Sequence, residues 1–200
     1  MFARIITFTG ARNIDAGISF LREDAVPVLR DQKGYRGLSA NADRSRGLLG
    51  VMTIWDTKDE RDASWTALAG TRQQGLDAVG GGMSSDNYEL VLQELGADPP
   101  VPGSALLLIP ASLDPARADE HLAYFRANVL PEIKQTPGFQ AVRMVLDRDS
   151  GNTITGTTWS GPEGLRAAAT AAEARRQPAA GRGVRFGEAS YREVVVSDIR

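Results

Sequence analysis

The side chains best suited to chemistry gather late in the first half of the chain. Arg72 lies at a helical spacing from Trp65 and could bind an oxyanion beside the indole ring. Asn87 and Tyr88 begin an apolar segment and could reach the mouth of a cavity. The chain has no cysteine and a single histidine, His121, so we expect no thiolate nucleophile and no metal site.

Composition narrows the classes of function. Of the 200 residues, 42% are hydrophobic and 24% are charged, which is typical of a globular protein. The formal net charge of −2 provides no basic field for a phosphate backbone, so we expect no nucleic-acid partner. The N-terminus does not have the pattern of a signal peptide, and the apolar stretch at residues 105–109 is far too short to span a membrane. We therefore expect a cytoplasmic protein without a membrane partner.

An internal repeat organises the chain. An ungapped shift of 104 positions aligns the two halves over several rare residue types. Near the end of each half the alignment is expected to slip by one residue, so that Tyr88 matches Tyr191. The positions matched by the shift include Asp15 and Asp119, Arg22 and Arg126, Pro27 and Pro131, Gly34 and Gly138, Thr53 and Thr157, and Trp55 and Trp159.

A segment rich in proline and glycine separates the two copies. Its prolines exclude a helix and remove backbone donors, so it is expected to form a stiff linker. We predict a first ferredoxin-like repeat at residues 1–95, a linker at 96–103 and a second ferredoxin-like repeat at 104–200.

Each copy has the pattern strand, helix, strand, strand, helix, strand. Apolar residues recur at helical spacing in the first helix, and Pro27 or Pro131 is expected to kink it. Thr57 and Ser160 are each followed three residues later by glutamate, the form of a capping box at the start of the second helix. The predicted strands include residues 3–9 and 105–109 at the start of each copy, and 88–92 and 191–196 at the end.

A sheet of this kind has both helices on one face and leaves its other face open. Strand segments such as 106–109 and 194–196 are apolar on both sides, as expected when both faces are covered. Two such sheets packed together would bury the open faces. The predicted fold class is α+β, with two ferredoxin-like βαββαβ repeats that form an intramolecular dimeric α+β barrel.

Three features recur in both halves and suggest a family. They are a late helix proline followed by glycine and an aromatic residue, a third strand that closes on tryptophan, and a capped helix after it. The residues are Pro27, Gly34, Tyr35, Thr53 and Trp55 in the first copy, and Pro131, Gly138, Phe139, Thr157 and Trp159 in the second. On these features the chain resembles the dimeric α+β barrel superfamily, and within it the antibiotic biosynthesis monooxygenase-like (ABM) domains.

The resemblance implies several activities, among them cofactor-free oxygenation of quinols and anthrones, and haem degradation. Trp65 lies near the position where haem-degrading relatives carry a tryptophan, but residues 68–78 lack the histidine that those relatives carry. We therefore expect a cofactor-independent monooxygenase of a small aromatic or polyphenolic substrate, with no cofactor. The expected site residues are Trp65, Arg72 and Tyr88 as catalytic groups, and Asn87, Trp55 and Arg22 as substrate-binding groups.

The two copies differ where a site would lie. Ala169 stands at the position of Trp65, so the first copy is expected to hold the pocket. Trp55 and Trp159 occur in both copies, which favours packing, and Arg22 and Arg126 favour a salt bridge to an acid. The alternative function is a non-catalytic or stress-related barrel that binds a small apolar or aromatic ligand. Either protein would be a monomer with a pseudo-dimeric barrel, and a homodimer stays open.

Overall fold

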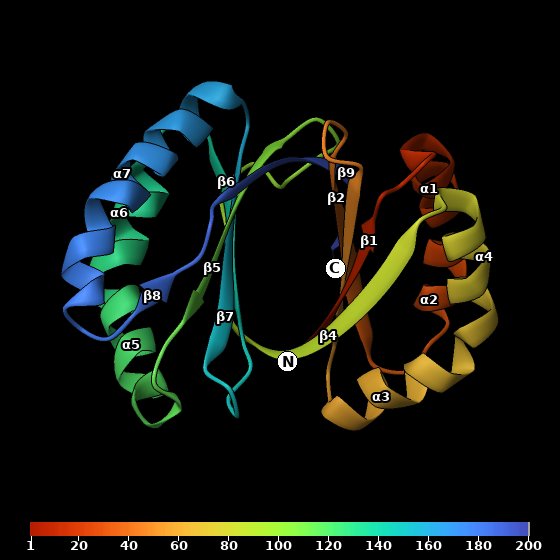
Figure 1. The fold of residues 1–200 in the computed structure, drawn as a ribbon, viewed down its shortest axis with the longest axis horizontal. Coiled ribbons are helices and arrows are strands. Elements are labelled where there is room, and N and C mark those ends of the chain that lie inside the picture. The colour runs from red at the N-terminus through yellow and green to blue at the C-terminus, as the bar shows by residue number, and fades with distance from the viewer. Residues whose placement is uncertain (200) are drawn as a thin grey trace. The chain divides into compact units, whose positions relative to one another are not determined.

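A computed structural model describes residues 1–199 (Figure 1). The chain forms two compact units. The first unit comprises Met1–Tyr88 together with the segment that begins at Glu193, and the second comprises Glu89–Arg192. Within residues 1–199, no helix is long and apolar enough to cross a membrane.

The first unit is an antiparallel sheet with helices packed on one face (Figure 1). Its strands lie in the order β4-β1-β3-β2-β9, of which β4 and β9 also continue into the second unit. The elements are β1 (Phe2–Thr9), α1 (Ile14–Phe20), the π-helical turn η1 (Leu21–Ala25), α2 (Val26–Arg30), β2 (Tyr35–Asp43), β3 (Leu48–Trp55), α3 (Lys58–Ala67), α4 (Ala69–Val79) and β4 (Gly82–Leu95).

The second unit repeats this plan, and β5 and β6 flank β7 in its sheet. A two-residue strand, β8, pairs with the other edge of β5 and was not expected. The elements are β5 (Ala105–Ser112), the 3-10 turn η2 (Pro115–Arg117), α5 (Ala118–Tyr124), the π-helical turn η3 (Phe125–Val129), α6 (Leu130–Gln135), β6 (Phe139–Leu146), β7 (Asn152–Trp159), α7 (Pro162–Ala180), β8 (Arg185–Phe186) and β9 (Ser190–Ile199).

Each unit is completed by the last strand of the other sequence repeat. In the first unit, β9 pairs with β2 from Glu193 opposite Ala42 to Ile199 opposite Gly37. In the second unit, β4 pairs with β6 over Glu89–Leu95. The division by packing therefore differs from the division by sequence repeat, which stays a prediction about how the sequence is organised.

The exchanged strands carry matching bulges. The register of β9 on β2 shifts around Val195, and the register of β4 on β6 shifts around Val91. These residues are 104 positions apart, as are Glu193 and Glu89, which lie opposite Ala42 and Leu146. The expected slip of one residue is therefore wrong. Matching two tyrosines suggested it, whereas strand pairing keeps the shift of 104 to the end of each repeat.

An arginine from the first helix of each unit binds the bulge. Arg22 donates a hydrogen bond to the carbonyl oxygen of Val195 over 2.8 Å, and Arg126 donates one to the carbonyl oxygen of Val91 over 2.7 Å. The partner is thus a backbone carbonyl in place of the acid that the sequence suggested. The acids of the exchanged strands bind one helical segment further on, where Arg30 pairs with Asp198, and Lys134 with Glu94.

A π-helical turn sits at the same place in both first helices. The backbone N–H of Val26 donates to the carbonyl of Leu21, five residues back, and Leu130 donates to Phe125 in the same way. The next residue in each copy is Pro27 or Pro131, which has no N–H to continue an α-helical ladder. The helix thus accommodates the proline with a π-turn, a local widening of the helix, and the kink itself stays a prediction.

The second helices begin differently. Thr57 caps α3 by accepting a hydrogen bond from the backbone N–H of Glu60 over 3.2 Å, as predicted. The predicted cap at Ser160 is wrong, because α7 begins at Pro162 and its cap position is Gly161, which has no side chain to accept a bond. Pro162 sets this boundary because proline fits the first helical position.

Each unit has its own core between the helices and one face of its sheet. Trp55 and Trp159 close these cores with 1% and 0% of their surface exposed. Each indole N–H donates to a threonine on the same strand, and each ring packs edge-on against an aromatic neighbour, Tyr35 or Phe139.

We expect Arg22→Met to lower the free energy of unfolding by about 1–2 kcal/mol, because a charged donor is taken from a buried carbonyl. Chemical denaturation of the purified variant measures this change. Arg36→Met is the matched control, since it breaks only an exposed ion pair with Asp56 and should cost less than about 1 kcal/mol. Equal losses in the two variants would contradict a special role for the bulge contact.

Candidate functional site

The predicted pair Trp65 and Arg72 does meet in the first unit. The helix breaks at Leu68, between α3 and α4, and this break was not expected from the sequence. The guanidinium of Arg72 stacks 3.5 Å from the centre of the Trp65 ring and donates to the Trp65 carbonyl. Arg4 on β1 lies 4.6 Å from the same ring centre, so two guanidiniums contact one indole.

Several acceptors bind the guanidinium of Arg4, whereas burial disfavours its charge. Arg4 donates to Asn87 Oδ1 over 3.0 Å, to the carbonyl of Arg61 over 2.9 Å and to Asp62 over 3.2 Å. Burial lowers the pKa of Arg4, the charge of Arg61 lowers it further, and Asp62 opposes both. Burial also lowers the pKa of Arg72. The guanidiniums of Arg4 and Arg72 therefore bind acceptors within the protein and are not free to bind a ligand.

Of the other expected site residues, one lines the cavity of the first unit and the rest contact other parts of the protein. Trp55 lines the same cavity as Trp65 and Arg72. Asn87 is one hydrogen bond away from it, through Arg4. Tyr88 and Arg22 do not belong to its lining: the Tyr88 carbonyl accepts a bond from Arg61, and Arg22 holds the bulge at Val195.

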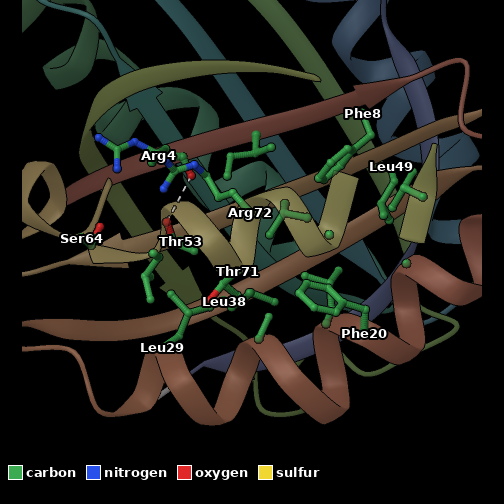
Figure 2. A pocket seen from close by; sticks show the side chains of 18 of the residues that line it. Arg4, Phe8, Phe20, Leu29, Leu38, Leu49, Thr53, Ser64, Thr71 and Arg72 are labelled. Carbon is green, nitrogen blue, oxygen red and sulfur yellow. Dashed lines mark hydrogen bonds between the residues drawn. The ribbon is translucent and has the colours of Figure 1, made fainter. Parts of the chain in front are cut away.

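The cavity of the first unit is small. Its volume is about 80 Å³, and Figure 2 shows Phe8, Phe20 and Leu49 crowding one part of it, away from Arg4. A cavity of about 150 Å³ is known to accept benzene, and ligand pockets usually measure roughly 300–1,000 Å³. This cavity has room for a few waters but not for an aromatic substrate.

The second unit holds a much larger cavity of about 570 Å³ between its helices and its sheet. The expectation that the first copy would hold the pocket is therefore wrong as far as size is concerned. Apolar side chains from α7, the first helix and the sheet supply most of the wall. The aromatic members are Tyr124, Phe125, Trp159 and Phe186, and the small members include Ala168, Ala171, Ala172 and Ala179.

Side-chain size on equivalent positions explains the difference between the units. Ala172 and Ala169 of α7 stand where the first copy has Leu68 and Trp65. In the first unit Leu68 is buried, so its volume fills space that Ala172, which lines the large cavity, leaves open. The run of alanines in α7 could have indicated a large cavity, because small side chains leave space between the helix and the sheet.

Polar side chains also line the large cavity, among them Asn128, Thr136 and Thr155. Thr153 donates to the carbonyl of Val145 over 2.7 Å, and Thr157 accepts from the Trp159 indole over 3.1 Å, so both are engaged within the protein. Glu132 is paired with Arg175, and its side chain is 62% exposed, which marks a side of the cavity that reaches solvent.

His121 is the functional candidate that sequence reasoning missed. It lies on α5 and lines the large cavity. In the sequence, a single histidine bears only on the question of a metal site. Within residues 1–199, no cluster of three or more histidine, aspartate or glutamate residues could hold a metal ion. The signal that could have found it is the repeat, because Gly17 occupies this position in the first copy.

Comparison with known proteins by sequence gives only distant relatives. No protein-family model matches the chain. It is similar to two uncharacterized proteins of Mycobacterium tuberculosis, Rv2557 and Rv2558, each 25% identical, over 149 and 136 residues. These matches cover 73% and 68% of this chain, but they span only 65% and 57% of the relatives' own length.

Solved structures match the whole fold. A candidate monooxygenase of Fusobacterium nucleatum superposes with a TM-score of 0.73 at 11% identity, covering 100% of this chain and 94% of its own. An anthrone oxidase-like protein gives 0.66 at 13% identity, with coverage of 100% and 91%. A haem-binding protein of Thermus thermophilus gives 0.59 at 12% identity, with coverage of 96% and 90%.

At these identities the likeness establishes the fold alone. The chain has the ferredoxin-like fold of the ABM type of dimeric α+β barrel proteins, and the fold class predicted from the sequence is confirmed. Several of the proteins that share this fold are named as monooxygenase-like or as haem-binding.

We expect Ala172→Leu to reduce the binding of aromatic ligands in the large cavity, because it restores the leucine of the first copy. The same change should raise the free energy of unfolding by about 0.5–2 kcal/mol through cavity filling. Titration with 2-naphthol, followed by tryptophan fluorescence, and thermal unfolding measure the two effects. Ala167→Leu, on the exposed side of α7, is the control and should change neither. Undiminished binding in Ala172→Leu would contradict this location of the ligand.

Proposed function

We propose that the protein is a cofactor-independent monooxygenase that oxygenates a small aromatic or polyphenolic substrate in the large cavity of the second unit. The observation that carries this proposal is the cavity itself, whose volume of about 570 Å³ lies in the range of pockets that bind small molecules. Its wall is largely apolar and aromatic, which suits a planar ring.

The neighbours by fold support this choice of chemistry. One is named as an anthrone oxidase-like protein, and others are named as monooxygenases or monooxygenase-like proteins. Their likeness is structural, so the reaction and the substrate class are transferred to this chain as a proposal.

The reaction asks little of the protein beyond binding and exclusion of water. With an anthrone as the substrate, the methylene carbon loses two hydrogens and gains one oxygen atom of O₂, and the other oxygen leaves as water with those hydrogens. The electrons come from the substrate once it is deprotonated, so no separate reductant is needed. An apolar wall that includes Phe125 and Trp159 would keep the reactive anion away from bulk water.

We assign the Trp65 cluster of the first unit a supporting role in this proposal. Its cavity is too small for the substrate, and its guanidiniums are bound to protein groups. Two arginines on one indole can stabilise the packing of α3 and α4 on β1. The catalytic roles expected for Trp65, Arg72 and Tyr88 stay predictions of the sequence.

A non-catalytic barrel that binds a small apolar or aromatic ligand is the second candidate. The observation that favours it is that Thr153, Thr157 and the Glu132–Arg175 pair of the wall are bound within the protein. In that case the protein would bind the same aromatic compounds and release them unchanged in air.

Oxygen uptake decides between the two functions. We expect the protein to consume one O₂ for each anthrone or quinol converted, with the rate unaffected by a metal chelator. Ala172→Leu should lose most of this rate, whereas Ala167→Leu should keep it. A polarographic assay with a panel of anthrones and quinols measures the rate. Binding of the panel without uptake would favour the non-catalytic barrel.

A further inference from the structure

His121 lines the large cavity, and one nitrogen of its ring is unsatisfied in the described part of the chain. Nε2 of His121 is buried and has no hydrogen-bond partner among residues 1–199. A buried polar atom without a partner loses its hydration and gains no hydrogen bond in return. Such atoms are uncommon in folded proteins, and each calls for an explanation.

The first unit cannot carry a side chain at the same position. Gly17 packs so closely that an added Cβ would lie 2.5 Å from Cγ2 of Val79 and 3.0 Å from Cδ2 of Leu49. In the second unit the positions equivalent to Val79 and Leu49 hold the smaller residues Gly183 and Thr153, which leave room for an imidazole. The histidine is therefore a feature of the enlarged cavity and not of the shared frame.

The other ionisable groups around the cavity have partners. Glu132 is paired with Arg175, and the guanidinium of Arg182 stacks 3.7 Å from the ring centre of Tyr124. His121 is thus the basic group of the lining that protein contacts leave unsatisfied.

We propose that His121 is the proton acceptor for a hydroxyl group of the ligand, so that the ligand is an ionisable phenol or enol and not merely an apolar ring. This inference rests on the proposed function. In the step, the ligand O–H bond breaks and an N–H bond forms at Nε2. The electron pair stays on the ligand oxygen, and the imidazolium that results lies beside the new anion. The phenolate is the electron-rich form that reacts with O₂.

Histidine suits this role because its neutral ring nitrogen accepts a hydrogen bond and can take a full proton near neutral pH. With the imidazole turned so that Nε2 faces the cavity, a neutral phenol would satisfy this nitrogen, whereas an aryl ether of the same shape would leave it unpaired. The structure therefore predicts discrimination between two ligands that differ only in one O–H group.

The test uses 4-nitrophenol and 4-nitroanisole under anaerobic conditions, at a pH where free 4-nitrophenol is mostly neutral. The two compounds have the same ring, and the neutral and anionic forms of 4-nitrophenol have separate absorption bands. We expect the wild-type protein to bind 4-nitrophenol about 10-fold more tightly than 4-nitroanisole, as fits a hydrogen bond to a charged group. The bound phenol should show the band of the anion.

Two variants separate proton transfer from shape. His121→Leu should bind both compounds with similar affinity and show no anion band. His121→Gln can still accept a hydrogen bond but cannot hold the proton, so it should keep part of the preference and lose the band. Glu94→Gln, which breaks only the exposed ion pair with Lys134, is the control and should behave as the wild type. Circular dichroism checks that each variant is folded.

The outcomes distinguish this inference from the proposed function. An anion band of undiminished intensity in folded His121→Leu or His121→Gln would overturn the role of His121. Equal binding of both compounds to the wild type would also overturn it and would leave the cavity as an aromatic site. Binding of neither compound would overturn the proposed function, and the inference with it.

Discussion

The contact between an arginine and a strand bulge is the constraint on which both units depend. Arg22 and Arg126 reach from the first helices to the carbonyls of Val195 and Val91, on strands contributed by the other sequence repeat. A bulge interrupts regular pairing, so a charged donor at that point fixes where the exchanged strand sits. The helix that supplies the arginine is shaped by a π-turn, and the turn allows for the proline that follows it. Sheet, helix and exchanged strand are therefore set together in each unit.

The two units share this arrangement of strands and first helix, but the side chains between helix and sheet differ from one unit to the other. In the first unit they are large, and they reduce the cavity to about 80 Å³. In the second unit smaller residues such as Ala172 replace them, and the cavity measures about 570 Å³. The change needs no alteration of strand pairing, because both registers keep the shift of 104 positions. A binding site can thus arise in one copy by loss of side-chain volume alone.

The order of strands and helices could be predicted from the sequence because it depends on residue types with few structural alternatives. Proline without an N–H, glycine at positive φ in Gly34 and Gly138, and a tryptophan at the end of the third strand all have strong local meaning. The cavity could not be predicted in the same way. Its volume depends on which side chains meet between helix and sheet, where Leu68 of one copy corresponds to Ala172 of the other, and spacing along the chain does not show which side chains meet. The break at Leu68 and the missing cap at Ser160 also depend on packing and on a competing proline.

The inequality of the copies also bears on which of them can do chemistry. Trp65 is present in the first copy and is replaced by alanine in the second, which suggested a function. Its ring is covered by the guanidiniums of Arg4 and Arg72, so it contributes to packing. His121 shows the reverse, since it is bound to nothing at Nε2 among the described residues and borders open volume. A polar atom left without a partner beside a cavity is a stronger sign of a ligand than an aromatic residue whose contacts are complete. The large cavity and His121 therefore favour a ligand site in the second unit over one in the first.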